Sequence, residues 1–282
     1  MKPLDVIKAP IWLAELASSA KSFKSNPLIG SPWLNERGLH ITRLRKAESM
    51  ADSRRRRLTH LVDSEDAGSF ARDGYVVRRN ALPAEIFARL RDQVQNHEFP
   101  AQEMLQGNAV TRFIPITRAM MGTYAELGAF MRGRLLQGLL RYVAAANAEP
   151  ISFIHTVFAE PHRGPRDPQT LFHSDTFHST AKAWYFLTDV AEDGGPLTYV
   201  PGSHRMTPAR LAWEREQSLS ARSDANSHHA HGSFRASEEQ LRDLGYAAPV
   251  RIAVPANTLV VADTHGFHAR AASEKPTVRL SL

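Results

Sequence analysis

Apolar residues in the first half of the chain recur three or four positions apart, which is the spacing of one face of an α-helix. This pattern predicts helices over residues 11–23, 64–73 and 127–146. A further helix is predicted after Pro83, because proline suits the first helical turn and apolar residues follow it at helical spacing. A short strand is predicted at residues 75–78. We therefore expect the first 150 residues to be mainly helical.

After Pro150 the pattern changes to short segments rich in β-branched and aromatic residues, which is typical of strands. Clusters of glycine, proline and aspartate separate these segments, as turns do. Many short strands separated by turns favour a β-sandwich or a barrel. The predicted strands are residues 151–158, 182–190, 197–200, 250–254, 258–262 and 277–282.

A helical insertion at about residues 205–245 interrupts the predicted strands. Two helices are predicted in it, the first starting at Thr207 and the second at Ser237. The loop between them contains three histidines, His228, His229 and His231. Three histidines can bind a metal, but a mobile polar loop is the interpretation we favour. A lid over the site is one role that such a loop can have.

Composition narrows the possible functions. The 282 residues include no cysteine, which excludes disulfides, zinc ribbons, iron–sulfur clusters and cysteine nucleophiles. No apolar run reaches the ~18 residues that a membrane span needs. The first 30 residues are too polar to resemble a secretory leader. We therefore expect a cytoplasmic protein without a transmembrane segment.

The net charge of +6 comes from the first 80 residues, which hold 15 Lys and Arg against 9 Asp and Glu. Residues 43–57 are the most basic stretch, but they lack interleaved aromatic residues and any recognisable nucleic-acid-binding module. We therefore expect a solvated loop or helix face and no nucleic-acid partner. The positive charge mildly favours an anionic small molecule as the substrate.

The most informative chemistry lies at His173 and Asp175. Residues two apart on a strand point to the same face, so this imidazole and this carboxylate are expected side by side. His265 and His268 are the candidates for a third ligand. Two histidines and one carboxylate form the facial triad of non-haem Fe(II) oxygenases, which leaves positions on the metal open for a cosubstrate and O₂.

Arg279 lies 11 residues beyond His268, in the last predicted strand. A guanidinium can form a bidentate pair with a carboxylate, such as that of a 2-oxo acid. The alternative is a surface arginine on an edge strand. A His-x-Asp pair on a strand, a histidine 95 residues later and this arginine are more specific together than any one of them alone.

Several short motifs accompany these residues. They are Phe-Ala-Arg-Asp-Gly-Tyr-Val-Val at 70–77, His-Ser-Asp at 173–175, Gly-Gly-Pro-Leu at 194–197, Val-Pro-Gly-Ser-His-Arg at 200–205, Gly-Phe-His at 266–268 and Arg279. With these motifs, the sequence from about residue 70 to the end resembles the phytanoyl-CoA dioxygenase family of Fe(II)/2-oxoglutarate-dependent oxygenases. The resemblance covers about three quarters of the chain and leaves residues 1–63 outside it.

The resemblance implies a mainly β fold with α-helices, in which helices flank a double-stranded β-helix, or jelly-roll, core. We expect residues 1–63 to form a basic N-terminal extension. Residues 64–282 are then a single oxygenase domain that contains the insertion at about 205–245.

The resemblance also implies roles for individual residues. His173, Asp175 and His268 match the iron ligands of the family, and Arg279 matches its anchor for the 2-oxoglutarate carboxylate. His265 is the less favoured third ligand, because it lacks the 11-residue spacing to the arginine. Two further cofactor contacts are predicted. His155 lies near the position of a glutamine that helps many relatives to hold 2-oxoglutarate, and Trp184 is expected to line the pocket.

The implied function is a dioxygenase that uses Fe(II), 2-oxoglutarate and O₂. Such an enzyme would hydroxylate an unactivated C–H bond of a small molecule and release succinate and CO₂. Two alternatives stay open: a binding protein on the same fold that has lost turnover, and another metal-dependent enzyme such as a zinc hydrolase. The intact ligand set argues against the first, and the second would not need Arg279. The sequence indicates neither the substrate nor the oligomeric state.

Overall fold

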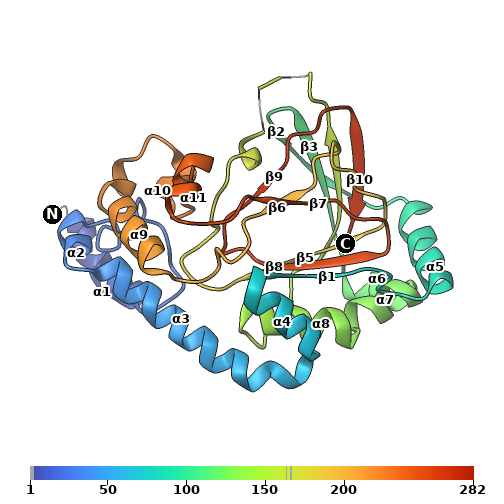
Figure 1. Cartoon of the computed structure of the whole chain (residues 1–282), viewed down its shortest axis with the longest axis horizontal. Helices are drawn as coiled ribbons and strands as arrows, with labels where there is room; N and C mark the ends of the chain where they lie inside the picture. Colours follow the sequence, from blue (N-terminus) through green and yellow to red (C-terminus); the bar gives the residue numbers. More distant parts are fainter. Residues whose placement is uncertain (1–2, 163, 166) are drawn as a thin grey trace.

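Two antiparallel sheets form the centre of the molecule. The computed structural model describes residues 3–162, 164–165 and 167–282 (Figure 1). The strands are β1 (Tyr75–Arg78), β2 (Gln102–Gln106), β3 (Ala109–Pro115), β4 (Phe153–Ala159), β5 (Ala181–Phe186), β6 (Leu197–Tyr199), β7 (Val250–Ile252), β8 (Thr258–Asp263), β9 (His268–Arg270) and β10 (Thr277–Ser281). Within these described residues, one sheet has seven strands in the order β1-β8-β5-β10-β4-β3-β2, and the other has three in the order β7-β6-β9.

An apolar core joins the two sheets. Phe186 of β5 and Val260 of β8 belong to one buried cluster with Tyr199 of β6 and Ile252 of β7. Neighbouring strands come from distant parts of the chain, since β1 pairs with β8 and β4 pairs with β10. Two packed antiparallel sheets with such crossovers form a jelly roll. The predicted core is therefore confirmed.

Strand β8 shows how the apolar pattern arises. All six of its residues are buried. Leu259 and Val261 belong to the core that the helices cover, whereas Val260 and Ala262 belong to the core between the sheets. A strand that is covered on both faces appears in the sequence as a continuous apolar run rather than an alternation. The run at residues 258–262 has this physical origin.

Helices cover the outer face of the larger sheet. α8 packs against β5 and β8, and Figure 1 shows α4, α7 and α8 together on this side. No helix within the described residues is long and apolar enough to cross a membrane. The helices are α1 (Pro3–Leu16), α2 (Pro32–Glu36), α3 (Leu39–Leu58), α4 (Ser64–Asp73), α5 (Ala84–Gln95), α6 (Arg118–Thr123), α7 (Ala125–Arg132), α8 (Arg134–Ala144), α9 (Pro208–Ser220), α10 (Ser227–Ala230) and α11 (Glu238–Asp243).

The helix predicted at residues 11–23 is wrong at its C-terminal end. α1 stops at Leu16, and a loop follows. The hydroxyl of Ser18 donates to the carbonyl of Glu15 at 2.9 Å and accepts from the amide of Ala20 at 3.1 Å. Serine side chains that bond to nearby backbone groups in this way compete with the helix.

The single helix predicted at residues 127–146 is also wrong, because two helices occupy this stretch. Gly133 has an extended ψ of 142° and separates α7 from α8. The apolar pattern continues across the break because both helices bury one face in the same core. The hairpin of β2 and β3 was missed as well, since most of β2 is exposed and carries little apolar signal.

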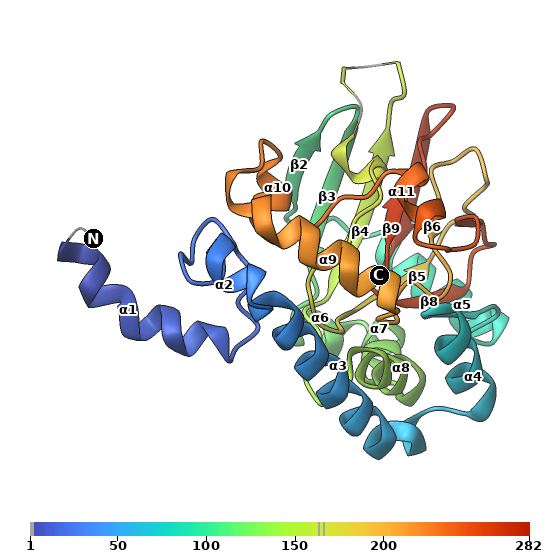
Figure 2. The same ribbon diagram turned by 60° about the vertical axis from the view of Figure 1, so that its left-hand side comes forward.

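The N-terminal segment packs on the insertion. His40 of α3 and Arg210 of α9 both contact the carboxylate of Glu214, with N–O distances of 2.8 and 2.9 Å. All three side chains are buried. A buried carboxylate needs such partners to offset its desolvation. Figure 2 shows the consequence: α2 and α3 lie beside α9, whereas α1 extends away from the sheets.

Candidate metal centre

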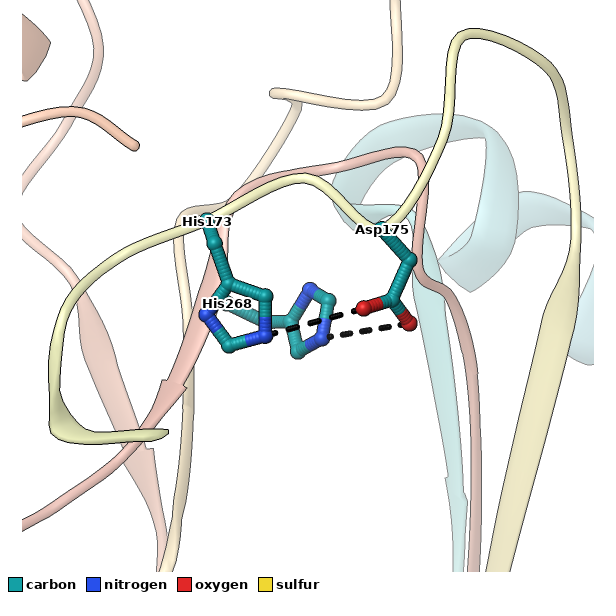
Figure 3. Close-up of side chains that lie close together, drawn as sticks. All are labelled: His173, Asp175 and His268. Carbon is teal, nitrogen blue, oxygen red and sulfur yellow. Dashed lines mark ion pairs between the residues drawn. The ribbon is translucent and has the colours of Figure 1, made fainter. Parts of the chain in front are cut away.

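Two backbone segments bring three candidate ligands together. The amide of His173 donates to the carbonyl of His268 at 3.0 Å, and the amide of His268 donates back at 3.0 Å. The amide of Asp175 bonds to the carbonyl of Thr264 at 2.8 Å. This pairing sets the two imidazoles side by side, with ring centroids 4.4 Å apart, and places the Asp175 carboxylate next to them (Figure 3).

The ligand atoms of these residues converge. Nε2 of His173 lies 3.6 Å from Oδ1 of Asp175, and Nε2 of His268 lies 3.7 Å from Oδ2 of Asp175. One donor atom from each residue fits within 4.8 Å of the other two. Within the described residues, this is the one group of three or more His, Asp and Glu side chains with such spacing. The cluster can hold a single metal ion.

Hydrogen bonds to the backbone fix both imidazoles. Nδ1 of His173 lies 2.7 Å from the carbonyl of Leu171, and Nδ1 of His268 lies 3.0 Å from the carbonyl of Gly266. A carbonyl only accepts, so each Nδ1 carries the proton and donates. The lone pair of each Nε2 is therefore left free and faces the cluster, as metal-binding histidines require.

The charge states of the cluster also suit a cation. Burial, followed by the nearby His268, lowers the pKa of His173 to about 3. Burial lowers the pKa of His268 as well, so both imidazoles are neutral at pH 7. Burial alone would raise the pKa of Asp175, but Lys182, 2.6 Å from Oδ2, holds that pKa below its usual range. The site thus offers two neutral nitrogens and one anionic oxygen.

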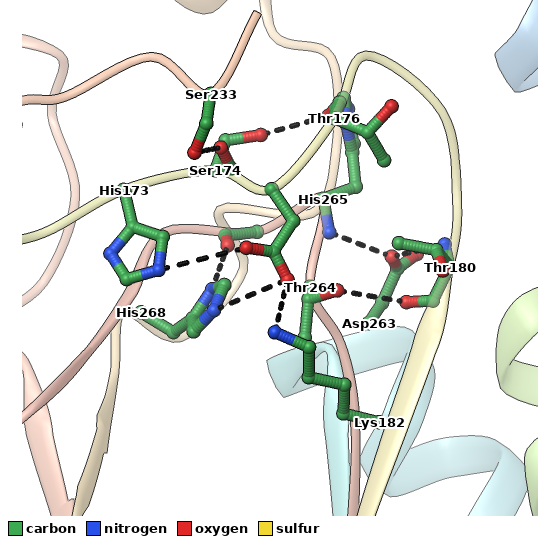
Figure 4. A network of polar contacts seen from close by, with 12 residues as sticks. His173, Ser174, Thr176, Thr180, Lys182, Ser233, Asp263, Thr264, His265 and His268 are labelled. Atoms are coloured by element: carbon green, nitrogen blue, oxygen red, sulfur yellow. Dashed lines mark hydrogen bonds and ion pairs between the residues drawn. The ribbon is translucent and has the colours of Figure 1, made fainter. Parts of the chain in front are cut away.

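His265 lies outside the cluster, although it is only three residues from His268. Its Nδ1 bonds to the carbonyl of Thr176 at 2.8 Å, and its amide donates to Oδ1 of Asp263 at 3.0 Å (Figure 4). Asp263 also accepts from the amide of Thr180 at 3.1 Å. His265 is therefore part of a buried network that supports the segment carrying His268.

The histidines of the insertion also lie outside the cluster. His229 is buried and stacks on Phe234 with ring centroids 4.5 Å apart, whereas His231 is exposed. No metal group within the described residues includes His228, His229 or His231. Their role as a lid stays a prediction.

A cavity of about 430 Å³, which we call the triad cavity, opens beside the two histidines. His155, Trp184 and Arg279 all line it, as do Lys182 and Arg270. The guanidinium of Arg279 donates to the carbonyl of Gly195. These predicted cofactor contacts therefore share one cavity with His173 and His268. Among the described residues, the lining of this cavity includes lysine and arginine but neither aspartate nor glutamate.

Burial changes the charge balance in this cavity. Burial, followed by Arg270, lowers the pKa of Arg279 to about 9, which leaves it charged at pH 7. Burial, followed by Arg270 and Arg279, lowers the pKa of His155 to about 4. Arg270 itself is paired with Asp167, with N and O atoms 2.7 Å apart. Of the two arginines that line the triad cavity, Arg270 has a carboxylate partner, whereas Arg279 has none among the described residues.

A family model supplies the decisive comparison. The model described as phytanoyl-CoA dioxygenase matches residues 70–240, which is more than half of the chain. The chain belongs to the phytanoyl-CoA dioxygenase family. The predicted recognition, enzyme class and cofactors are therefore confirmed: this is a family of Fe(II)- and 2-oxoglutarate-dependent dioxygenases. The matched stretch contains His173 and Asp175, whereas His268 and Arg279 lie beyond it.

The chain is similar to several solved structures, of which the first named here shows the same fold. The epimerase SnoN, in complex with Fe³⁺, α-ketoglutarate and nogalamycin RO, is 20% identical, with a TM-score of 0.50 over 77% of this chain and 80% of that chain. EctD from S. alaskensis with bound Fe is 15% identical, with a TM-score of 0.48 over 78% and 75%. HygX from Streptomyces hygroscopicus with nickel and 2-oxoglutarate is 15% identical, with a TM-score of 0.45 over 78% and 85%. No curated protein matches the sequence.

Two residues beside the cluster were not predicted from the sequence. Both lie outside the strands. The ammonium of Lys21, in the loop after α1, donates to the backbone carbonyl of Asp175. Arg235, in the insertion, forms an isolated backbone bridge with His173. Neither residue stands in a motif, and each reaches the site only through packing between distant segments. No pattern in the sequence could have indicated either one.

Proposed function

We propose that this protein is an Fe(II)/2-oxoglutarate-dependent hydroxylase in which His173, Asp175 and His268 hold the iron. The observation that supports this most directly is the convergence of two imidazole nitrogens and one carboxylate oxygen within 4.8 Å. Two histidines and one carboxylate are the donor set that non-haem Fe(II) oxygenases use. The fixed tautomers and neutral charge of both histidines fit this role.

We also propose that Arg279 anchors 2-oxoglutarate. A charged guanidinium in the cavity beside the histidines can pair with the distal carboxylate of the cosubstrate. His155 lines the same cavity and is neutral at pH 7, so it can donate one hydrogen bond without adding charge. Trp184 contributes an apolar wall, which helps to exclude water from the site.

The bound iron and its cosubstrate supply the oxidising chemistry: 2-oxoglutarate, O₂ and a C–H bond yield succinate, CO₂ and a C–OH group. The chain supplies position and charge. Asp175 provides the single negative charge among the ligands, and Lys182 keeps its carboxylate ionised. Backbone bonds between His173 and His268 hold the two ligand segments at a fixed separation, as a preorganised site requires.

An anionic small molecule is our proposed substrate, because lysine and arginine side chains exceed acidic ones around the cluster. We place the protein in the cytoplasm, since a chain without cysteine is suited to a reducing compartment.

An anaerobic titration with Fe(II) and 2-oxoglutarate tests the proposed ligands. We expect wild-type protein to develop the weak visible charge-transfer absorption of the iron–cosubstrate chelate. Asp175→Ala should abolish this absorption, because the anionic ligand is lost. Arg279→Ala should raise the concentration of 2-oxoglutarate needed for half-saturation by roughly tenfold or more, since a charge-assisted pair is lost.

The same samples then receive O₂, and succinate is measured. Wild-type protein that binds iron but gives neither the absorption nor succinate would overturn the proposed function. Equal absorption in wild type and Asp175→Ala would remove Asp175 from the ligand set.

A further inference from the structure

A second cavity meets the cluster on the Asp175 side. This cavity, of about 890 Å³, is called the outer cleft here; the loop after α1 forms one wall and residues 175–182 form the other. Asp175 and Lys21 line the outer cleft, whereas His173, His268 and Arg279 line the triad cavity. Lys182 lines both cavities. The two cavities therefore border different ligands of the cluster: Asp175 lines the outer cleft, whereas His173 and His268 line the proposed cosubstrate pocket.

Two ammonium groups meet at Asp175 in the outer cleft. Nζ of Lys182 lies 2.6 Å from the carboxylate oxygen Oδ2, and Nζ of Lys21 donates to the backbone carbonyl. Glu15 is the other acidic residue that lines the cleft, and its carboxylate accepts from Asn26 at 2.7 Å. Both lysines line the cleft. A metal ion held by Asp175 would draw on the charge of its carboxylate and leave the two ammonium groups able to pair with another anion.

The fold holds Lys21 in this position. The amide of Lys24 donates to the carbonyl of Ala230 at 3.0 Å, and Phe23 is buried in the core that includes Phe234. The backbone of Lys21 also packs closely on Gly232, where a Cβ atom would lie 2.2 Å from the Lys21 carbonyl oxygen. The loop is thus packed between Asp175 and the insertion. These backbone and core contacts, and not only the rotamer of its side chain, place Lys21 at the cleft.

We infer that Lys21 and Lys182 bind a carboxylate or phosphate group of the substrate, next to the carbon that is oxidised. Both ammonium groups contact Asp175, so a group bound between them lies beside the iron ligands. This inference rests on the proposed function and adds the substrate class: a small organic acid or phosphate ester whose anionic group is close to the reacting carbon. Lys21 is then a specificity-determining residue, and it comes from a segment outside the family match.

Isothermal titration calorimetry with three aromatic probes tests this inference. Benzoate, phenyl phosphate and neutral benzamide are titrated, without O₂, into protein saturated with Fe(II) and 2-oxoglutarate, so that the triad cavity is already filled. We expect at least one anion to bind tenfold or more tightly than benzamide. The tighter of the two anions distinguishes a carboxylate substrate from a phosphate substrate.

Matched variants assign the effect to Lys21. Lys21→Met should weaken binding of the preferred anion by roughly tenfold or more, because an ammonium contact with an anion is lost. Lys24→Met removes an exposed lysine of the same loop and should leave the affinity unchanged. Lys21→Arg should retain most of the affinity, which separates a charge effect from a disturbed loop.

The iron–2-oxoglutarate absorption is recorded in every sample and keeps the two proposals distinguishable. Normal absorption with equal anion affinity in wild type and Lys21→Met would overturn the inference and leave the proposed function standing. Tighter binding of benzamide than of either anion would also overturn it. Loss of the absorption in wild type would instead contradict the proposed function.

Discussion

His265 and His268 are three residues apart and both buried, yet they differ in what their rings contact. Nε2 of His268 faces Asp175 at 3.7 Å, whereas Nδ1 of His265 bonds to the carbonyl of Thr176. We predict that His268→Gln abolishes tight Fe(II) binding, because one of the three proposed ligands is lost. His265→Gln should retain Fe(II) binding within about threefold, since His265 lies outside the cluster.

Metal analysis after anaerobic gel filtration, with circular dichroism to check the fold, measures this pair of variants. Glutamine is similar in size to histidine, and the same replacement is made at both positions. The comparison therefore isolates the role of each side chain as a metal ligand. Loss of iron from His265→Gln but not from His268→Gln would exchange the two assignments. Equal loss of iron from both folded variants would contradict the prediction. It would mean that the buried network around His265 is as important for iron binding as His268.

At the scale of elements, two helical glycines differ in the space around them. A Cβ atom at Gly138 of α8 would lie 2.5 Å from the backbone carbonyl oxygen of Leu61, whereas at Gly68 of α4 it would meet nothing within 4 Å. We predict that Gly138→Ala lowers the free energy of unfolding by about 1–3 kcal/mol, because the helix must move away from its neighbour. Gly68→Ala should raise it by about 0.5–1 kcal/mol, since alanine favours the helix.

Urea unfolding followed by circular dichroism measures both changes. Stabilisation by Gly138→Ala would show that α8 does not need its close approach to the segment that follows α3. The prediction matters for the site, because α8 packs on β5 and β8. Strand β5 follows Asp175 in the chain, and β8 precedes His268.

At the scale of the whole molecule, Asp263 links three distant segments. Its carboxylate accepts from the amides of Thr180 and His265, and Oδ2 lies 3.7 Å from Nη2 of Arg55 in α3. Burial raises the pKa of Asp263 to about 6, although Arg55 opposes this shift. Below the unfolded-state value of 3.8 the carboxyl is protonated in both states, so its contribution to stability is fully present there. That contribution is lost as the pH rises through 6, because the unfolded chain ionises more easily.

We predict that Asp263→Asn removes this pH dependence. From pH 4 to pH 7, the free energy of unfolding of the variant should rise relative to wild type by about 2 kcal/mol, because most of the effect of a shift of about two pKa units falls between these pH values. Urea unfolding at both pH values and constant ionic strength measures the difference. Asp189→Asn, which removes an exposed carboxylate that also accepts a backbone hydrogen bond, serves as the control. A constant difference between wild type and Asp263→Asn would show that the carboxyl is ionised at both pH values.

The sequence by itself determined the local features of this protein. The change at residue 150 from helical to strand-like spacing indicated a β core, and β4, β5, β8 and β10 lie where strands were predicted. His173 and Asp175 were paired on the expectation of a strand, on which residues two apart share a face. That strand is wrong, because the structure gives His173 an isolated bridge and Asp175 a bend, yet the two side chains still meet. The same short-range rule, together with the family motifs, indicated the enzyme class. These features depend on neighbours in the chain, so the order of residues is enough to predict them.

Only the tertiary structure decided which distant residues meet. It brought His268 rather than His265 to Asp175, because the backbone pairing of His173 with His268 sets the register of two segments 95 residues apart. It also brought Lys21 to Asp175 across 154 residues of sequence. The spacing to Arg279 already favoured His268 over His265. The contact of Lys21 depends on how helices and sheets pack in three dimensions, and no motif in the sequence records it.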